Sequence, residues 1–150
     1  MRSLSRRETL LLAINTAAVA VVAAGRATAT PNEAQAEIAT FTGGKMAQPG
    51  RISIDLPEIA ENGNAIPLSI VVDSPMTADD HVAEVLVIAE NNPRPRVANF
   101  RFSSLSGRAE AVTRIRLAAT QNVIVIARTS DGQLFTARKE VKVTIGGCGG

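Results

Sequence analysis

From residue 52 onward, apolar and polar side chains alternate along short segments, which is the pattern of strands with one buried face. Residues 52–56 form the first such segment, and residues 66–72 form the second. Five further strand-like segments follow. Those at residues 85–88 and 123–127 are continuous apolar runs, and those at residues 100–102, 112–117 and 134–145 have apolar residues on one face. Turn residues separate these segments, and Asp131-Gly132 is a strong hairpin signal between the last two. The pattern predicts about seven strands.

Residues 31–42 have a helical pattern and are predicted to form a short helix. Pro31 suits the first turn of a helix, and acidic side chains occur in the N-terminal half, where they complement the helix dipole. Ile38 and Phe41 would lie on one face. Gly43-Gly44 follows and is expected to end the helix.

Seven short strands within residues 52–145 indicate an all-β protein, an immunoglobulin-like antiparallel β-sandwich with a short N-terminal helix. The chain has no Trp or Tyr and only four Phe, so its core must consist of Val, Ile, Leu and Ala, a composition that favours strands. The Cys-Trp-Cys pattern of antibody domains is missing. We therefore expect the general architecture, as one domain over residues 30–145.

The first 29 residues have the features of an export signal. Ser5 precedes the paired Arg6 and Arg7, an apolar stretch covers residues 10–24, and Ala27-Thr28-Ala29 is a small-residue cleavage pattern. Paired arginines indicate the twin-arginine route. A membrane anchor is the alternative, but the apolar stretch is shorter than the about 20 residues that a bilayer requires. Residues 1–29 are therefore predicted to be a twin-arginine signal peptide, and the mature protein is expected in the periplasm.

Removing this leader reverses the balance of charge. The whole chain has a net charge of +2, from 16 basic and 14 acidic residues. The leader holds four of the basic residues and one of the acidic ones, which leaves 12 basic and 13 acidic residues in the rest. No general affinity for nucleic acid or for an anionic membrane is indicated.

Residue types for catalysis are scarce. His81 is the only histidine and adjoins Asp79 and Asp80, so a blue-copper or zinc site lacks ligands, and a solvated polar loop is the preferred interpretation. Glu58 and Glu61 could form an acidic pair, but they adjoin a turn signal and fit a polar loop better. We expect no metal, no cofactor and no catalytic residue.

The last five residues hold the strongest candidate for chemistry. Cys148 is the only cysteine, and a pair of glycines flanks it on each side: Gly146, Gly147, Gly149 and Gly150. Glycines offer little packing surface and lose the most entropy when ordered, so residues 146–150 are expected to form a flexible arm with an exposed thiol. The backbone from Ile145 to Cys148 reaches about 10 Å, enough to place the sulfur in the cleft of a neighbouring protein.

Two other interpretations of the tail stay open at this point. The glycines could be a frayed end with an accidental cysteine. Alternatively, Cys148 could form an intermolecular disulfide in an exported β-sandwich interaction module. A redox enzyme is less well supported, because the chain has no Cys-x-x-Cys pair.

The tail resembles the terminal Gly-Gly-Cys-Gly-Gly of the SoxY family, the sulfur-carrier subunits of bacterial thiosulfate oxidation. Segments 56–63 (Leu-Pro-Glu-Ile-Ala-Glu-Asn-Gly) and 72–77 (Val-Asp-Ser-Pro-Met-Thr) are similar to the same family. So are segments 115–117 (Ile-Arg-Leu) and 120–123 (Thr-Gln-Asn-Val), and the leader also fits.

The resemblance implies a non-enzymatic carrier with an immunoglobulin-like fold, which holds thiosulfate-derived intermediates covalently on Cys148. It implies a heterodimer with SoxZ and transient contacts with SoxXA, SoxB and, where present, SoxCD. SoxXA would attach thiosulfate oxidatively, SoxB would release sulfate by hydrolysis, and SoxCD would oxidise the remaining sulfur. The glycines would serve as a swinging arm, and neither nucleic acid nor, after signal cleavage, a membrane would be a partner.

Overall fold

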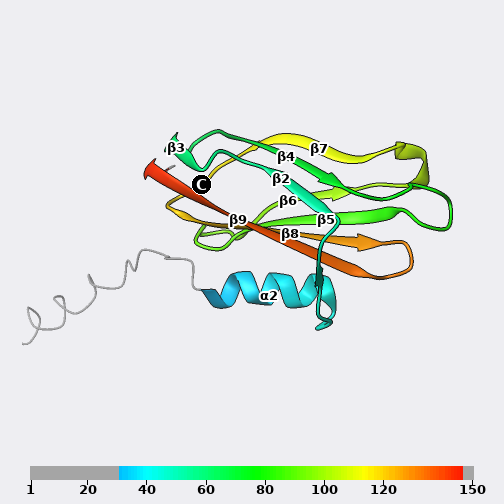
Figure 1. The fold of residues 1–150 in the computed structure, drawn as a ribbon. Coiled ribbons are helices and arrows are strands. Elements are labelled where there is room, and N and C mark those ends of the chain that lie inside the picture. The colour runs from blue at the N-terminus through cyan, green and yellow to red at the C-terminus, as the bar shows by residue number, and fades with distance from the viewer. Residues whose placement is uncertain (1–30, 147–150) are drawn as a thin grey trace, which may run out of the picture.

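In the computed structural model, which describes residues 31–146, two β-sheets pack face to face and a helix lies on the outer side of the larger sheet (Figure 1). The larger sheet has the strand order β1-β9-β8-β5-β6, and β3 also pairs with β9. The smaller sheet has the order β2-β4-β7. This arrangement confirms the predicted β-sandwich with an N-terminal helix.

The larger sheet consists of β1 (Gln48–Pro49), β3 (Ile59–Asn62), β5 (Val82–Ala89), β6 (Arg96–Arg101), β8 (Gln121–Thr129) and β9 (Leu134–Ile145). The smaller one consists of β2 (Ile52–Asp55), β4 (Ile66–Val72) and β7 (Ala109–Ile115). Helix α2 covers Pro31–Thr42, and a 3-10 turn at Ser104–Ser106 connects β6 with β7. The predicted bounds of the helix, of β4 and of β9 are those observed.

The main core lies between the two sheets and follows from the alternation in the sequence. In β4, the side chains of Ile66, Leu68 and Ile70 are buried, while Pro67 between them is exposed. Facing residues of β5, β8 and β9 complete this cluster, including the fully buried Val125. Aliphatic side chains therefore fill the space between the sheets, as the composition predicts.

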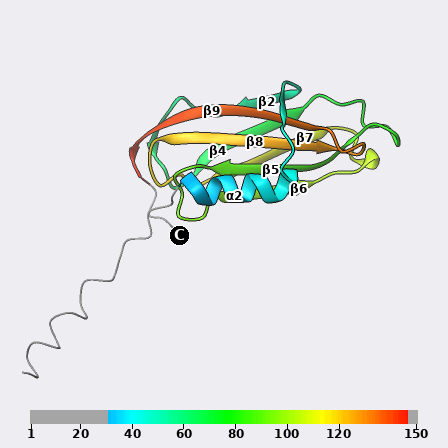
Figure 2. The same ribbon diagram turned by 90° about the horizontal axis from the view of Figure 1, so that it is seen from below.

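A second, smaller core lies between the larger sheet and helix α2, which runs along this sheet next to β5 (Figure 2). Leu86 and Ile88 of β5 and Ile126 of β8 pack there with Ala34 and Phe41 of the helix. β5 and β8 are thus covered on both faces for most of their length. Double coverage is the reason why these two strands have continuous apolar runs in the sequence instead of alternation.

Two strand pairings were not predicted, and both are parallel rather than antiparallel. β1 and β3 pair with opposite ends of the same edge of β9. In β3, Ile59 pairs with Lys142 and Asn62 pairs with Ile145. Segment 59–62 has only two apolar residues, and Ile59 is 60% exposed, so its sequence carries no strand signal. Backbone pairing to β9 and not side-chain burial makes it a strand, and it covers an edge that would otherwise be open.

The predicted chain reversals are confirmed. Gly43 and Gly44 have φ angles of 62° and 76° at the end of α2, and the amide of Gly44 donates to the carbonyl of Ala39 at 3.1 Å. Gly132, with φ 83°, closes the β8–β9 hairpin, and its amide donates to the carbonyl of Thr129 at 2.9 Å. Left-handed φ angles of this kind favour glycine.

The predicted signal peptide, residues 1–29, lies outside the described residues. Within residues 31–146, no helix combines the length and the apolarity needed to cross a bilayer.

Candidate functional site at the base of the C-terminal arm

The structure describes Gly146, the first residue of the predicted arm, and the loops that surround it at the end of β9. Gly146 directly follows β9 and is exposed. The other arm residues, Gly147, Cys148, Gly149 and Gly150, lie outside the described residues. The predicted roles of Cys148 and of the flexible glycines therefore stay predictions.

Gly146 lies in close contact with the backbone of Ala118. A Cβ atom built on Gly146 would lie 2.1 Å from the carbonyl oxygen and 3.2 Å from the carbonyl carbon of Ala118. Any side chain at position 146 would force the backbone of one of the two segments to move. Glycine at this position is thus required by a close approach, a reason different from the flexibility that the sequence suggested.

The end of β9 is held by the turn that follows β3. The amide of the buried Gly63 donates to the carbonyl of Ile145 at 2.9 Å, and the carbonyl of Gly63 accepts from the amide of Leu117 at 2.8 Å. The hydroxyl of Thr144 donates to the carbonyl of Glu61 at 2.9 Å. Gly63 therefore connects the last residue of β9 to the loop between β7 and β8, which carries Ala118.

The side chain of Asn92, which is 7% exposed, holds this loop in place through hydrogen bonds. The Asn92 Nδ2 donates to the carbonyl of Arg116 at 2.7 Å, and its Oδ1 accepts from the amide of Ala118 at 2.9 Å. The Oδ1 also accepts from Nε2 of the buried Gln121 at 2.9 Å, and Gln121 accepts from the amide of Asn91 at 2.7 Å. A buried network in which each of these groups is satisfied holds a loop in one conformation.

A further contact joins the other end of this loop to β9. The Thr120 Oγ1 accepts from the amide of Val143 at 2.9 Å. Three of the sequence segments noted above, residues 56–63, 115–117 and 120–123, thus meet at the base of the arm. The fourth, residues 72–77, follows the end of β4 that is remote from it, since Val72 pairs with Ala109 and Ile66 pairs with Ile115.

The single histidine belongs to a hydrogen-bonded turn at that remote end. The ring Nδ1 of His81 lies 3.0 Å from the carbonyl oxygen of Thr77, and the His81 amide donates to Oγ of Ser130 at 3.2 Å. The amide of Asp80 donates to Oγ1 of Thr77 at 3.0 Å. These contacts agree with the polar-loop interpretation of residues 79–81. Within residues 31–146, no three His, Cys, Asp or Glu side chains gather in a way that could hold a metal.

Glu58 and Glu61 both lie along the β3 edge and are exposed. Their contacts to β9 are made by the backbone: the carbonyl of Glu58 accepts from the amide of Lys142 at 2.9 Å, and that of Glu61 accepts from Thr144. Both residues therefore contribute backbone contacts to the pairing of the β3 edge with β9.

Four arginines gather beside the arm base, which the sequence did not indicate. Arg94 lies in the connection between β5 and β6, and Arg96 is the first residue of β6. Arg114 lies near the end of β7, and Arg116 directly follows that strand. Together they line one cavity of about 260 Å³, and Ala118 lines the same cavity. Arg114 and Arg116 belong to the predicted strand segment 112–117, but the sequence carried no signal that a second pair of arginines would line the same cavity.

Two carboxyl groups have lowered pKa values, and neither belongs to the arm base. The side-chain amide of Asn99, which donates to Glu84, is the main cause that lowers the pKa of Glu84; burial opposes it, and Arg128 and Arg101 add to the lowering. The hydroxyl of Thr129 is the main cause that lowers the pKa of Asp131, in the β8–β9 hairpin. Both shifts reflect stabilising contacts of the fold.

Comparisons with known proteins agree with the resemblance noted in the sequence. The family model described as sulfur oxidation protein SoxY matches residues 38–148. No curated protein sequence matches the chain significantly.

Among solved structures, the sulfur carrier protein SoxY from Chlorobium limicola f thiosulfatophilum is 29% identical, with a TM-score of 0.62. That match covers 77% of this chain and 100% of the other. A superoxide reductase (neelaredoxin) from Ignicoccus hospitalis is 19% identical, with a TM-score of 0.57 over 75% of this chain and 91% of that protein. At this identity, the second similarity shows the shared fold alone. The family match spans most of the chain and includes Cys148, and this chain therefore belongs to the SoxY family of sulfur oxidation proteins.

Proposed function

We propose that this protein is a periplasmic carrier that holds thiosulfate-derived intermediates covalently on Cys148 and presents them to partner enzymes. Membership of the SoxY family indicates the sulfur-carrier role, and it is the observation that carries the proposal. The structure supports the proposal because the arm is attached to a hydrogen-bonded part of the sandwich. A carrier needs such a fixed point of attachment, since it limits the region of space that the thiol can reach.

The chemistry requires nothing of the carrier except a reachable thiol. In the attachment step, the Cys148 thiol and thiosulfate form an S–S bond, giving Cys–S–S–SO₃⁻ with release of one proton and two electrons. An oxidising haem partner of the SoxXA type takes up the electrons. Hydrolysis by a SoxB-type enzyme then uses one water to release sulfate and two protons, and leaves a persulfide anion on Cys148. Catalysis belongs to these partners, so the carrier itself is not an enzyme.

Intact mass spectrometry of the native protein, before and after reduction, tests the attachment. Sulfur adducts on Cys148 that reductant removes are the expected result, and Cys148→Ser should lack them and lose carrier activity with its fold intact. A stable disulfide-linked dimer without adducts would instead favour the interaction module with an intermolecular disulfide.

The partner enzymes must reach Cys148, and we propose that the protein works as a heterodimer with a SoxZ-type subunit. It would meet SoxXA, SoxB and, where present, SoxCD transiently. Co-expression with a SoxZ candidate followed by gel filtration tests the heterodimer. Separate elution of the two chains at micromolar concentration would count against it.

Export by the twin-arginine route is the proposed way to the periplasm, from the pattern at Arg6 and Arg7. Replacing both residues by Lys should prevent export of a tagged chain. Normal export of that variant through the general secretory pathway would contradict the proposed route.

A further inference from the structure

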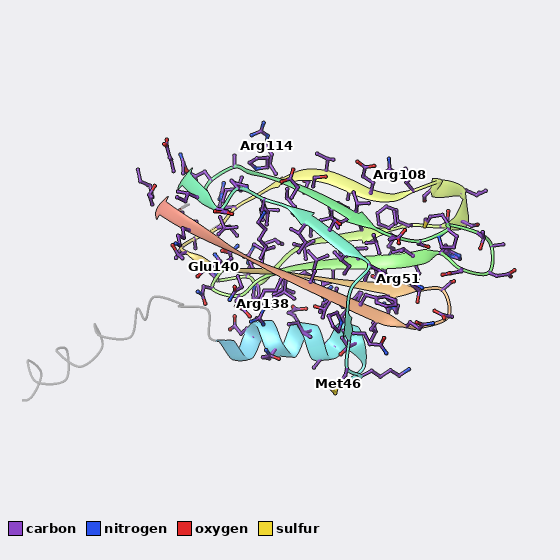
Figure 3. All side chains as sticks on the ribbon, in the orientation of Figure 1. Met46, Arg51, Arg108, Arg114, Arg138 and Glu140 are labelled. Carbon is purple, nitrogen blue, oxygen red and sulfur yellow. The ribbon has the colours of Figure 1, made fainter. Side chains whose placement is uncertain are left out.

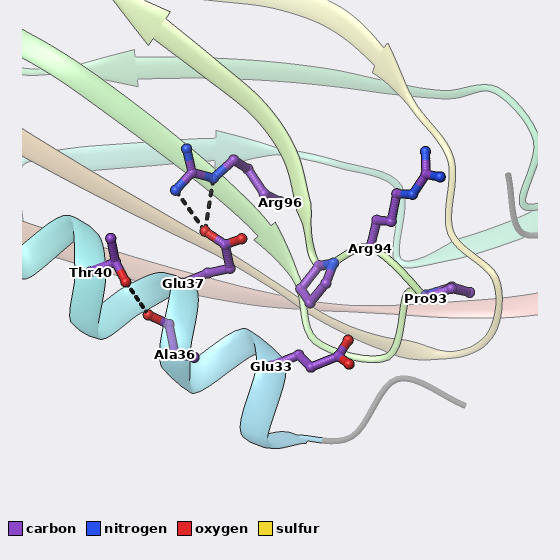
Figure 4. Close-up of a pocket in the computed structure, with 8 residues that line it drawn as sticks. Glu33, Ala36, Glu37, Thr40, Pro93, Arg94 and Arg96 are labelled. Atoms are coloured by element: carbon purple, nitrogen blue, oxygen red, sulfur yellow. Dashed lines mark hydrogen bonds and ion pairs between the residues drawn. The ribbon is translucent and has the colours of Figure 1, made fainter. Parts of the chain in front are cut away.

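The cavity beside the arm base differs in charge from the larger cavity next to it. The larger one, about 760 Å³, lies between helix α2 and the β5–β6 connection (Figure 4). Glu33 and Glu37 line it together with Arg94 and Arg96, so its charges balance. The smaller cavity, which we name the arginine pocket, is lined by Asn92, Arg94, Arg96, Val97, Arg114, Ile115, Arg116 and Ala118. Of the described residues, none with an acidic side chain lines the arginine pocket.

Only part of the positive charge around the arginine pocket is neutralised by carboxylates of residues 31–146. Arg96 pairs with Glu37 on helix α2 at 2.6 Å. Arg94 extends away from that helix (Figure 4), and no ion pair joins it to a carboxylate of a described residue. Arg114 projects on the side of the molecule opposite α2 (Figure 3), and its Nη1 donates to the carbonyl of Ala65 over a long distance of 3.5 Å. The pocket therefore has the charge to hold an anion.

The arm begins at the wall of this pocket. Ala118 lines the arginine pocket, and the same residue is in close contact with Gly146. Cys148 is two residues beyond Gly146, which is about 7 Å of extended backbone. A group attached to its sulfur is therefore tethered within reach of the pocket, and tethering gives it a high effective concentration there.

The charge of the proposed cargo fits these side chains. A thiosulfonate, Cys–S–S–SO₃⁻, ends in three oxygens that share one negative charge. Guanidinium groups bind such oxoanions with several N–H donors in a planar fork, and a charge-assisted hydrogen bond is roughly twice as strong as a neutral one. The persulfide that remains after loss of sulfate lacks these oxygens and would be held less well.

We infer that the arginine pocket binds the anionic sulfonate end of the group carried on Cys148 of the same chain. This inference rests on the proposed carrier function and adds a second position for the arm. Between enzymes, the loaded arm lies along the carrier with its sulfonate at Arg94 and Arg114. Loss of the sulfonate as sulfate weakens this binding and releases the arm. The carrier thereby distinguishes a thiosulfonate from a persulfide.

The test uses the mature full chain to Gly150, loaded chemically on Cys148. Tetrathionate reacts with the thiolate to give Cys–S–S–SO₃⁻ and releases thiosulfate, so no enzyme is needed, and mass spectrometry verifies the loading. NMR signals of the arginine Nε–H groups are then compared between the free and the loaded protein. Loading should shift the signals of Arg94 and Arg114. Alkylation of Cys148 with neutral iodoacetamide should not.

The rate at which the adduct is cleaved provides a second test, which compares the wild type with arginine variants. A neutral dithiol cleaves the S–S bond of the adduct, and binding in the pocket should slow this cleavage. The double variant Arg94→Gln/Arg114→Gln should react about three- to tenfold faster at low salt, the range expected for partly exposed ion pairs. The difference should shrink at 1 M salt, where the screening length is about 3 Å. Arg101→Gln/Arg108→Gln, which removes two exposed arginines outside the pocket, is the matched control.

Equal cleavage rates in the wild type and the Arg94→Gln/Arg114→Gln variant, with unchanged arginine signals, would overturn the inference. So would equal shifts with the neutral and the anionic adduct, because the pocket would then bind the arm and not the charge. Arginine signals that respond only when a partner subunit is added would assign the pocket to an acidic partner surface and would also overturn it. Absence of native adducts on Cys148 would count against the carrier function itself, which this chemically loaded protein does not test.

Discussion

Gly146 and Ala118 approach each other so closely that a Cβ atom at position 146 would lie 2.1 Å from the Ala118 carbonyl oxygen. The two residues are 28 positions apart in the sequence, and they meet because β9 ends beside the loop that follows β7. The contact places the start of the arm on a loop that is itself held by Asn92. The arm therefore begins at a defined point of the sandwich.

Replacing Gly146 by Ala should displace the base of the arm. The added Cβ cannot be accommodated without backbone movement, and this movement should weaken the hydrogen bond from the Gly63 amide to the carbonyl of the adjoining Ile145. We expect the Gly63 amide to exchange with solvent at least about tenfold faster, which corresponds to about 1.4 kcal/mol of local opening free energy. Hydrogen exchange by NMR measures this.

Gly149→Ala is the control for this substitution, because it adds the same methyl group farther along the arm. Its Gly63 exchange rate should equal that of the wild type. Unchanged exchange in the Gly146→Ala protein would show that the arm base can move away from Ala118 without affecting the end of β9.

Removing the side chain of Asn92 should strongly destabilise the fold. Asn92→Ala leaves the carbonyl of Arg116, the amide of Ala118 and the side chain of Gln121 without their partner. Unsatisfied buried polar groups cost about 1–3 kcal/mol each, and partial access to water reduces the sum, so we expect a loss of about 2–4 kcal/mol in the free energy of unfolding. Urea denaturation measures it. Asn91→Ala removes a neighbouring, exposed amide and should change the stability by less than about 0.5 kcal/mol.

Stability should decrease in acid partly through Glu84. Its carboxylate accepts from Asn99 at 2.8 Å and pairs with Arg128, and these contacts lower its pKa below the ordinary value of 4.5. Because the pKa of Glu84 is lower in the folded protein than in the unfolded chain, its contribution to the free energy of unfolding is complete above pH 4.5. This contribution disappears as the pH falls through the pKa that Glu84 has in the folded protein.

Glu84→Gln should therefore be less stable than the wild type at pH 7, by about 1 kcal/mol after solvent screening, and the two should converge in acid. Thermal unfolding between pH 7 and pH 3 measures the difference. Glu58→Gln, on the exposed β3 edge, controls for the loss of a surface carboxylate. A constant difference between Glu84→Gln and the wild type at all pH values would contradict an ionic contribution.

A β-branched residue in the arm should separate the reactivity of the thiol from its delivery. Gly147→Val and Gly149→Val keep Cys148 but add bulk and stiffness beside it. We expect both variants to react with small alkylating agents at the wild-type rate and to lose most turnover with the partner enzymes. Wild-type turnover in both would show that the arm does not enter narrow clefts, even if Cys148 is the attachment point.

Local patterns in the sequence determined the elements that bury one face, and the tail motif indicated the family. The alternation in residues 66–72 predicted β4 with its observed bounds, because period-two burial is a property of the strand and its own side chains. The apolar positions within residues 134–145 likewise predicted β9 with its observed bounds. The Gly43-Gly44 pair likewise ended the helix through its own backbone conformation. The tail pattern around Cys148 is also local, and it identified the family that the comparisons show.

Only the tertiary structure decided which distant segments meet. β3 has no apolar pattern of its own, since its strand is made by backbone hydrogen bonds to residues about 80 positions later, so no local signal could predict it. The contact of Gly146 with Ala118 and the meeting of the pairs Arg94/Arg96 and Arg114/Arg116 at one cavity arise in the same way. Periodicity reports whether a side chain is buried, but the identity of its neighbour depends on the order and register of the strands. Those are set by the packing of the whole sandwich and not by any one segment.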